Sequence, residues 1–354
     1  MPEPRNYLVA GAGGVIGTTL LKHLTAQGHA AWGVSRRPPA ATPRWKHLSV
    51  NLAEANGALE GLRPAAATNR LAFAAYVERQ DPQRQIKDNV ALLSNTLTAL
   101  ERLDAPLEHV TLYQGMKYYG AHLGPFKTPA LETDPRLAAA NFYYEQEDLL
   151  REHADHRGYQ FTLLRPEGVI GYAVGTPMNL LMGLGVYVAL TRHLGVPLRF
   201  PGPREAYDSV LYQVSDAQLL AEATEWAGDA PSAWGEAFNL TNGDVFRWRQ
   251  LFDAIARRFE LELAEPQCMN LATQMPQHAG LWAHLAESFE LHTPDLASVV
   301  DWRFTDAILG STWDNVSSTI KVRQAGFSAS LHSVERIVDL LEDLVLRKIL
   351  PPLA

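Results

Sequence analysis

The chain has 354 residues, 47% of them hydrophobic and 20% charged, with a formal net charge of −8 at pH 7. Its length suits one large α/β domain or a nucleotide domain with a smaller lobe, and its acidic balance argues against a surface for nucleic acid or an anionic membrane. The single cysteine, Cys268, excludes an intramolecular disulfide and has no partner at metal-ligand spacing. Since the first strand leaves no room for a signal peptide, we expect a cytoplasmic protein. We expect no metal site, because His122 and His193 also lack metal-ligand spacing.

A strand, a glycine-rich turn, a helix and a second strand follow one another between Tyr7 and Arg37. This order predicts a dinucleotide-binding βαβ unit, because each glycine of the turn has a physical task. Gly11 allows the tight turn, Gly14 lets the main chain approach a pyrophosphate, and Gly17 lets the helix pack against the strand. The GxxGxxG spacing is the form common in short-chain dehydrogenases, and the helix N-terminus favours the charge of the pyrophosphate.

The end of the second strand selects the nucleotide. An NAD enzyme usually has an acidic residue there, which binds the ribose 2′-hydroxyl, whereas an arginine accommodates the 2′-phosphate of NADP. This chain has Ser35, Arg36 and Arg37 at that point and no acidic residue nearby. Two guanidinium groups and a hydroxyl can pair with a phosphate, so the predicted cofactor is NADP(H).

Strands and helices alternate through the first half of the chain. The apolar patterns predict strands at His47–Val50, Arg70–Ala75, His109–Gln114 and Gln160–Leu164, with helices at Gln83–Leu103 and Asn141–His156 between them. Such alternation is typical of right-handed βαβ units and a doubly wound parallel (Rossmann) sheet of the α/β class. We therefore assign residues 1–170 to an NADP-binding Rossmann domain.

The pattern changes after Arg165, and residues 171–354 are expected to form mainly a smaller C-terminal substrate-binding lobe, with some segments returning to the Rossmann core. The elements predicted there are a buried or lid-like helix at Met178–Leu194, a helix at Ser215–Ala227, a strand at Ala237–Leu240, a helix at Asp244–Phe259, a loop at Pro266–His278 and a final helix at Ser333–Lys348. The final helix is amphipathic, so it suits either the core or a subunit contact in a homodimer.

Short-chain dehydrogenases activate a tyrosine phenol with a lysine ammonium, normally as YxxxK on one helix. Tyr113 and Lys117 have this spacing, but His109–Gln114 alternates as a strand, and residues four apart on a strand are roughly 13 Å apart. We therefore reject this pair and expect Lys117 just past the carboxyl end of a strand, where ligands of such folds bind. The helix that begins near Asn141 supplies two tyrosines, Tyr143 and Tyr144, but no lysine four residues after either, so Lys117 is the expected source of the ammonium group.

The chain resembles the progesterone 5β-reductase/iridoid synthase-like family, an atypical branch of the short-chain dehydrogenases. The segments that carry the resemblance are spread over nearly the whole chain, and the NFYYxxED and NxxNGDVF strings are the most specific of them. They are residues 114–119 (QGMKYY), 141–148 (NFYYEQED), 165–171 (RPEGVIG), 177–180 (PMNL), 239–246 (NLTNGDVF) and 304–310 (FTDAILG).

The resemblance implies that Tyr143 and Lys117 form the catalytic couple and that NADPH is used to reduce the activated C=C bond of enones and enals. Hydride would reach the β-carbon, the Tyr143 hydroxyl would donate a hydrogen bond to the carbonyl oxygen, and Lys117 would lower the tyrosine pKa. The residues expected at the substrate are Tyr76, Tyr119 and Phe126. The residues expected at the cofactor are Gly11, Gly13, Gly14, Val15, Ile16, Gly17, Ser35, Arg36, Arg37, Asn51, Leu52, Ala75, Gln114, Tyr143, Val169, Thr176 and Met178.

The chain departs from the family pattern at three places. Gln114 replaces a threonine beside the cofactor, Glu167 stands where a Pro-Gly turn is usual, and residues 121–123 lengthen a loop near the expected substrate mouth. The steroid or iridoid substrates of plant members are therefore not transferred to this chain. Two alternatives remain. A carbonyl/alcohol oxidoreductase or sugar-nucleotide epimerase could use the same residues, because the fold cannot decide between these reactions; retention of Tyr143 and Lys117 argues against a non-catalytic NADP-sensing protein.

Overall fold

A seven-stranded parallel sheet forms the centre of the first of two compact units in the computed structural model, which describes residues 5–38, 45–173, 175–176 and 178–354. The strand order is β3-β2-β1-β4-β5-β6-β9, and every neighbouring pair is parallel. The strands are β1 (Asn6–Ala10), β2 (Ala30–Ser35), β3 (Lys46–Ser49), β4 (Arg70–Phe73), β5 (His109–Tyr113), β6 (Gln160–Pro166) and β9 (Ala237–Leu240). This order confirms the predicted doubly wound α/β fold.

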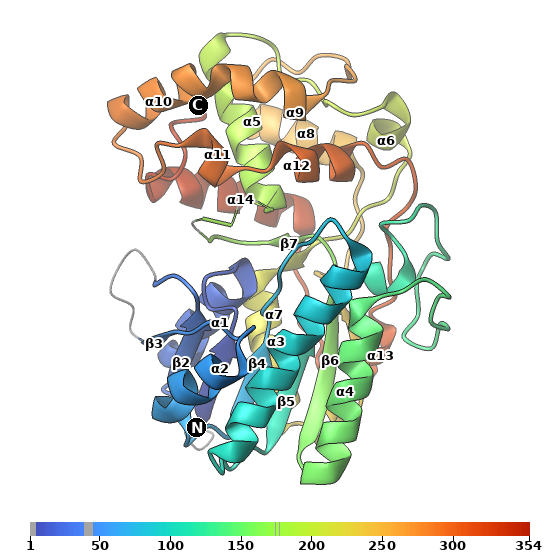
Figure 1. Ribbon diagram of the computed structural model, residues 1–354. Coiled ribbons are helices and arrows are strands. Elements are labelled where there is room, and N and C mark those ends of the chain that lie inside the picture. Colours follow the sequence, from blue (N-terminus) through green and yellow to red (C-terminus); the bar gives the residue numbers. More distant parts are fainter. Residues whose placement is uncertain (1–4, 39–44, 174, 177) are drawn as a thin grey trace. The chain divides into compact units, whose positions relative to one another are not determined.

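The central strands are covered on both faces, which explains their nearly continuous apolar sequences. Every residue of the central strands β4 and β5 is buried, and so is every residue of the edge strand β9, as expected for a parallel sheet between two helical layers. Helices α2 (Ala55–Leu62), α3 (Pro82–Arg102) and α4 (Phe142–Arg157) pack side by side over one face, and α1 (Val15–Ala26) packs against α7 (Ala217–Asp229) over the other (Figure 1). The short helices η1 (Arg63–Ala65), η2 (Met116–Tyr119), η3 (Pro231–Ala233) and α13 (Ile320–Gln324) complete this unit.

The first unit comprises Met1–Glu167, Ala217–Leu240 and Ser318–Ala329. Its last strand and the helix before it thus come from the second half of the chain. The strand predicted at Ala237–Leu240 is β9, and it pairs with β6 at the edge of the sheet. Segments from beyond residue 170 therefore do complete the sheet.

The second unit comprises Gly168–Asp216, Thr241–Ser317 and Ser330–Ala354, and it is built around α5 (Leu180–Leu194). Twelve residues of α5 are buried, because Gly183 and Gly185 allow close packing: a Cβ there would come 2.4 Å from Thr305 and 2.6 Å from Leu350. The other elements are the strand pair β7 (Val169–Ile170) and β8 (Ser215–Asp216) and the helices α6 (Arg204–Asp208), α8 (Trp248–Arg258), α9 (Leu271–Gln274), η4 (Met275–His278), α10 (Ala279–Ser288), α11 (Leu296–Val299), α12 (Trp302–Leu309) and α14 (Ser333–Leu346).

The loop predicted at Pro266–His278 is helical over its second half, so that prediction was wrong there. Asn270 caps α9 by accepting a hydrogen bond from the amide of Thr273 at 2.9 Å. The carboxylate of Asp306, on α12, accepts two more from the amides of Leu271 and Ala272. The second set of bonds comes from a residue distant in sequence, which local composition does not reveal.

Candidate active site

The glycine-rich turn between β1 and α1 has the geometry that the sequence predicts. Gly11 has φ +90° and lies against the end of β4, where a Cβ would come 2.6 Å from the carbonyl oxygen of Ala74. A Cβ at Gly17 would come 2.2 Å from the carbonyl oxygen of Gly11, so only glycine lets α1 start this close to the turn. Gly14 precedes α1, and its nearest neighbour from a Cβ is at 3.4 Å, so its outer side remains open.

This turn fits the pyrophosphate of a dinucleotide. Val15, Ile16 and Gly17 form the first turn of α1, whose amide groups have no partners within the helix. Gly14, the N-cap, brings no side chain to bond them. Open amides and a positive dipole end favour an anion at this point. Gly13 lies beside Ser35, whose hydroxyl would be 3.9 Å from a Cβ at Gly13, so the turn and the end of β2 face one another.

The end of β2 has a cationic character. Arg36 and Arg37 are exposed, and the Ser35 hydroxyl donates to the carbonyl oxygen of Arg37 at 2.7 Å. His47 on β3 also lies at the end of β2, with its Nε2 atom 2.9 Å from the Ser35 hydroxyl oxygen. Burial lowers the pKa of the His47 imidazole. His47 cannot be recognised from the sequence as part of this site, because only the pairing of β2 with β3 brings it beside Ser35.

Three further predicted cofactor residues follow strands of the sheet: Asn51 and Leu52 come after β3, and Ala75 comes after β4. Asn51 is exposed, and its side-chain amide donates to Glu54 at 2.7 Å. Leu52 is buried, and its carbonyl oxygen accepts from Asn95 at 2.9 Å. Ala75 follows β4, and its amide nitrogen would be 2.9 Å from a Cβ at Gly11. All three are at the carboxyl edge of the sheet, where ligands of such folds bind.

Tyr143 and Lys117 come from different elements that meet at the end of β5. Lys117 belongs to η2, which two residues separate from the end of β5, and Tyr143 is the second residue of α4. A Cβ at Gly115 would come 3.2 Å from the Tyr143 hydroxyl, so the phenol lies at this strand end. Asn141 joins the two elements, because its side chain accepts from the Tyr143 amide at 3.0 Å and donates to the Lys117 carbonyl at 2.7 Å.

The Lys117 ammonium is held by neighbours that the sequence did not reveal. Its Nζ atom is 3.4 Å from the Tyr76 hydroxyl and 3.7 Å from the Glu78 carboxylate, and Tyr76 donates a hydrogen bond to Glu78. Within the described residues, no hydrogen bond joins this ammonium to the Tyr143 hydroxyl. Burial raises the pKa of the Tyr143 phenol, and the charges of Glu167 and Glu78 raise it further. The phenol's pKa is thus shifted in the opposite direction to the expected lowering, and a contribution of Lys117 to it stays a prediction.

Tyr113 is unsuited to catalysis, as predicted from its strand. It is the last residue of β5 and is buried, and its hydroxyl bonds the Thr224 hydroxyl on α7. Its side chain is thus used in packing between sheet and helix. The rejection of the YxxxK spacing at residues 113–117 agrees with this geometry, since Lys117 lies beyond the strand in η2.

Of the three residues expected at the substrate, Tyr76 is the most accessible at 37% exposure. Its ring lies 5.6 Å from that of Phe142. Tyr119 is buried, and its hydroxyl donates to Asn239 at 2.7 Å and accepts from Arg165 at 3.0 Å. Burial raises the pKa of Tyr119 to about 12. Phe126 is half-buried against the small apolar cluster that includes Tyr119. Tyr119 is thus engaged in the interior through its hydroxyl.

Gln114 is also turned inward. Its side-chain amide donates to the carbonyl oxygen of Tyr143 at 3.0 Å and accepts from Arg165 at 2.8 Å. A contact between Gln114 and the cofactor, as predicted, would have to come from its main chain. Val169, Thr176 and Met178 belong to the second unit and are each half-buried there; their contact with the cofactor stays a prediction.

Among the residues that the structure describes, no group of three or more His, Cys, Asp or Glu side chains could hold a metal ion. The same part of the chain contains no helix long and apolar enough to cross a bilayer.

Residues 65–300 match the family described as a PRISE-like Rossmann-fold domain. An (S)-8-oxocitronellyl enol synthase from Camptotheca acuminata is 30% identical over 97% of this chain and 93% of its own length. A 3-oxo-Delta(4,5)-steroid 5-beta-reductase from Arabidopsis thaliana is 29% identical over 97% of this chain and 92% of its own.

The fold is shared with solved structures of lower identity. A UDP-glucose 4-epimerase from Brucella ovis in complex with NAD has a TM-score of 0.67 at 17% identity, covering 94% of this chain and 96% of its own. The enzyme of the same name from Thermotoga maritima with UDP-glucose has a TM-score of 0.68 at 14% identity, covering 95% and 97%. At such identities these structures show the fold alone.

Proposed function

Because the chain belongs to the PRISE-like Rossmann-fold family, whose relatives here are named as a reductase and as enol synthases, we propose that this oxidoreductase uses NADPH to reduce the activated C=C bond of enones and enals. The name of the Arabidopsis relative specifies a 3-oxo group conjugated to a 4,5 double bond, which is an enone. A nicotinamide dinucleotide suits the glycine-rich turn, and a 2′-phosphate suits the basic end of β2.

The observation that carries the proposal is the position of the Tyr143 hydroxyl. It lies at Gly115, at the carboxyl end of β5, and the Lys117 turn is tied to it through Asn141. NADPH, when bound, supplies a hydride to the β-carbon of the enone. Negative charge then develops on the carbonyl oxygen, and the Tyr143 hydroxyl can donate a hydrogen bond to it while Lys117 adds a positive field.

The state of the phenol favours a reduction, of an enone or of a carbonyl, over the oxidation of an alcohol. Oxidation of an alcohol, the reverse of carbonyl reduction, needs a phenolate that accepts a proton, and this requires a lowered pKa. Burial and the charges of Glu167 and Glu78 act in the opposite direction at Tyr143. A phenol that keeps its proton is suited to donating a hydrogen bond to an enolate oxygen.

Deuterated NADPH tests the proposal directly. With 2-cyclohexen-1-one, the deuterium should appear on the β-carbon of the saturated ketone, as read by mass spectrometry and NMR of the product. Deuterium on the carbinol carbon of an allylic alcohol, with the double bond intact, would establish the carbonyl-reductase alternative instead. Turnover that is absent for every enone, enal and ketone, despite tight NADPH binding, would favour the NADP-sensing alternative.

A further inference from the structure

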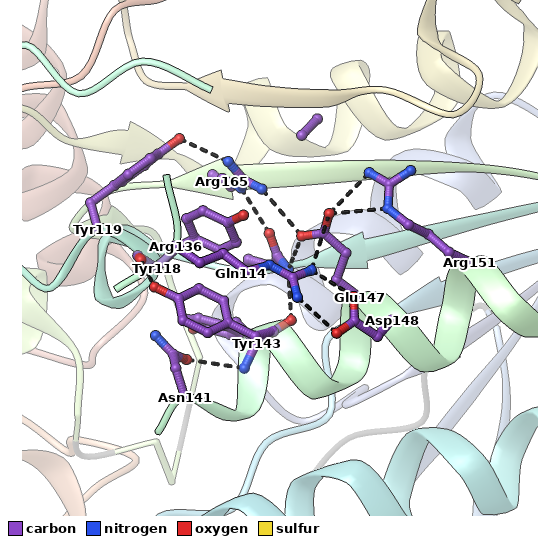
Figure 2. Close-up of polar contacts among 12 residues, drawn as sticks. Gln114, Tyr118, Tyr119, Arg136, Asn141, Tyr143, Glu147, Asp148, Arg151 and Arg165 are labelled. Carbon is purple, nitrogen blue, oxygen red and sulfur yellow. Dashed lines mark hydrogen bonds and ion pairs between the residues drawn. The ribbon is translucent and has the colours of Figure 1, made fainter. Parts of the chain in front are cut away.

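Glu147 lies on α4, the helix that also contains Tyr143. It is four residues after Tyr143 on α4, the position at which a YxxxK helix has its lysine, so both side chains are on one face. Glu147 is buried, and its carboxylate lies 3.3 Å from Arg165 and 2.9 Å from Arg151 (Figure 2). Arg136 is a third guanidinium at 3.7 Å. The chain thus has a buried carboxylate at the position where a YxxxK helix has its lysine.

Arg165 reaches this carboxylate from β6. Its side chain is 1% exposed, and the guanidinium lies 3.4 Å from the centre of the Tyr118 ring. The Nε atom donates to Gln114 at 2.8 Å, and one terminal nitrogen donates to the Tyr119 hydroxyl at 3.0 Å. Together with the ion pair to Glu147, these bonds engage the guanidinium with three neighbouring side chains, so its positive charge is balanced inside the protein.

Gln114 connects this pair to the main chain of Tyr143. Its amide nitrogen faces the Glu147 carboxylate at 3.4 Å and the Tyr143 carbonyl oxygen at 3.0 Å. Arg165 has only donors and an ionised Glu147 only acceptors, so the amide of Gln114 is satisfied in a single orientation. The cluster therefore joins the end of β5, the strand β6 and the first two turns of α4.

We propose that the Arg165–Glu147 pair, acting through Gln114, positions the Tyr143 phenol for catalysis. Gln114 directly precedes Gly115, the residue beside which the phenol lies. A shift of the first turn of α4 against the end of β5 would therefore move the hydroxyl away from the reacting oxygen. The proposal rests on the proposed role of Tyr143 as the hydrogen-bond donor. Glu147, Arg165 and Gln114 are positioning residues in this scheme, since they act through Tyr143.

The kinetic test uses Gln114→Met and Glu147→Gln, each alone and combined with Tyr143→Phe. Each single variant should lower kcat for 2-cyclohexen-1-one by about 10-fold to 100-fold, the scale of a small misplacement of a reacting group, while the Kd for NADPH stays near the wild-type value. In the Tyr143→Phe background neither should cause a further loss, because the group that they position is already absent. Losses that multiply with that of Tyr143→Phe would overturn the proposal.

The matched control is Arg151→Ala. Arg151 contacts the outer oxygen of the same carboxylate and the carbonyl of Gly235, and its side chain is 42% exposed. Its removal weakens a partly exposed pair without touching Gln114, so kcat should remain close to that of the wild type. An equal loss of kcat in Arg151→Ala would show that weakening any ion pair of Glu147 disturbs α4, and it would contradict positioning through Gln114.

A second measurement does not depend on the substrate. With tyrosine labelled by ¹³C at the ζ carbon, the resonance that disappears in Tyr143→Phe reports on this phenol. It should shift in Gln114→Met and Glu147→Gln and stay in place in Arg151→Ala. If the wild type fails to reduce enones, the proposed function fails while this arm still tests the positioning. An unmoved resonance in Gln114→Met, the variant that leaves the ion pair intact, would overturn the inference.

Discussion

At Tyr143, the surroundings of the phenol determine how activity should depend on pH. Burial and the charges of Glu167 and Glu78 raise its pKa above the ordinary value of a tyrosine, which is about 10. The donating, protonated form is therefore present below that value and is lost only as the pH rises through the still higher folded pKa. We predict that kcat/KM for an enone shows no decline from tyrosine ionisation between pH 7 and about 9.5.

The check is a pH profile of kcat/KM at saturating NADPH, with Glu78→Gln as the companion variant. Removing this carboxylate should bring the Tyr143 pKa closer to its ordinary value, since Glu78 is one of the charges that raise it. An alkaline decline centred well below pH 9.5 in the wild type would contradict the assignment of the phenol as a permanent donor.

The roles of the two candidate tyrosines can be separated by single substitutions. Tyr143→Phe and Lys117→Ala should each lower turnover by about 10²–10³-fold, the usual cost of losing one donor to a developing oxyanion. NADPH binding, followed by fluorescence, should survive. Tyr113→Phe should retain nearly full turnover, because it loses only a buried bond to Thr224, worth about 1 kcal/mol of stability. An inactive Tyr113→Phe together with an active Tyr143→Phe would identify Tyr113, instead of Tyr143, as the catalytic tyrosine.

At the scale of elements, the start of α1 has two glycines with different tasks, and substitution by alanine should separate them. A Cβ at Gly17 would collide with the carbonyl of Gly11 at 2.2 Å, whereas one at Gly14 would have only an ordinary contact at 3.4 Å. Gly14 also has φ −84°, which alanine adopts without strain. Gly17→Ala should therefore lower the melting temperature as well as NADPH affinity.

Gly14→Ala should instead keep the melting temperature of the wild type and lose NADPH affinity, because its methyl group would stand where the pyrophosphate approaches the main chain. Thermal denaturation of each variant gives its melting temperature, and a fluorescence titration gives its Kd for NADPH. Unchanged affinity in a stable Gly14→Ala variant would contradict the placement of the pyrophosphate at this turn.

Short helices were the elements hardest to foresee. The long helix α3 is recognisable from its apolar period and its Asp81 cap, which accepts from Gln83 at 3.0 Å. By contrast, α9 has only four residues, and Asp306 of α12 completes its first turn from 34 and 35 residues away. Helices this short are marginal alone, so tertiary bonds rather than local propensity explain them.

At the scale of the whole molecule, the choice of cofactor should be visible in thermal stability. A ligand that binds only the folded state stabilises it by about 2.7 kcal/mol at a concentration of 100 Kd. At equal concentration, NADPH should raise the melting temperature of the wild type more than NADH does. Replacing both Arg36 and Arg37 by alanine should abolish this difference, since each charged hydrogen bond to the 2′-phosphate is worth about 1.5–3 kcal/mol.

NADH is the internal control, because its ribose has no phosphate for these arginines to bind. Equal shifts by the two cofactors in the wild type would contradict the assignment of NADP(H). The predicted homodimer stays a prediction. The buried face of α14, which includes Ile337, Leu341 and Leu344, packs inside the second unit, so of the two roles expected for this helix it serves the core.

The amino-acid sequence was sufficient for features that depend on local rules. Period and alternation predicted the parallel sheet, and the glycine spacing predicted the turn, because main-chain sterics act over a few residues. The strand pattern at His109–Gln114 excluded the YxxxK pair for the same reason, and the family resemblance identified Tyr143 and Lys117 as the candidate couple. Ser35 and the two arginines could be read from the end of a strand.

The neighbours of these residues in the folded protein could not be predicted from the sequence. Glu78 beside Lys117, His47 beside Ser35, and Arg165 on Glu147 each come from a separate strand, turn or helix, and their contacts exist only once the sheet has its register. Burial and these distant charges set the raised pKa of Tyr143, opposite to the sequence expectation. Electrostatic interactions depend on distance and burial, and neither follows from spacing along the chain.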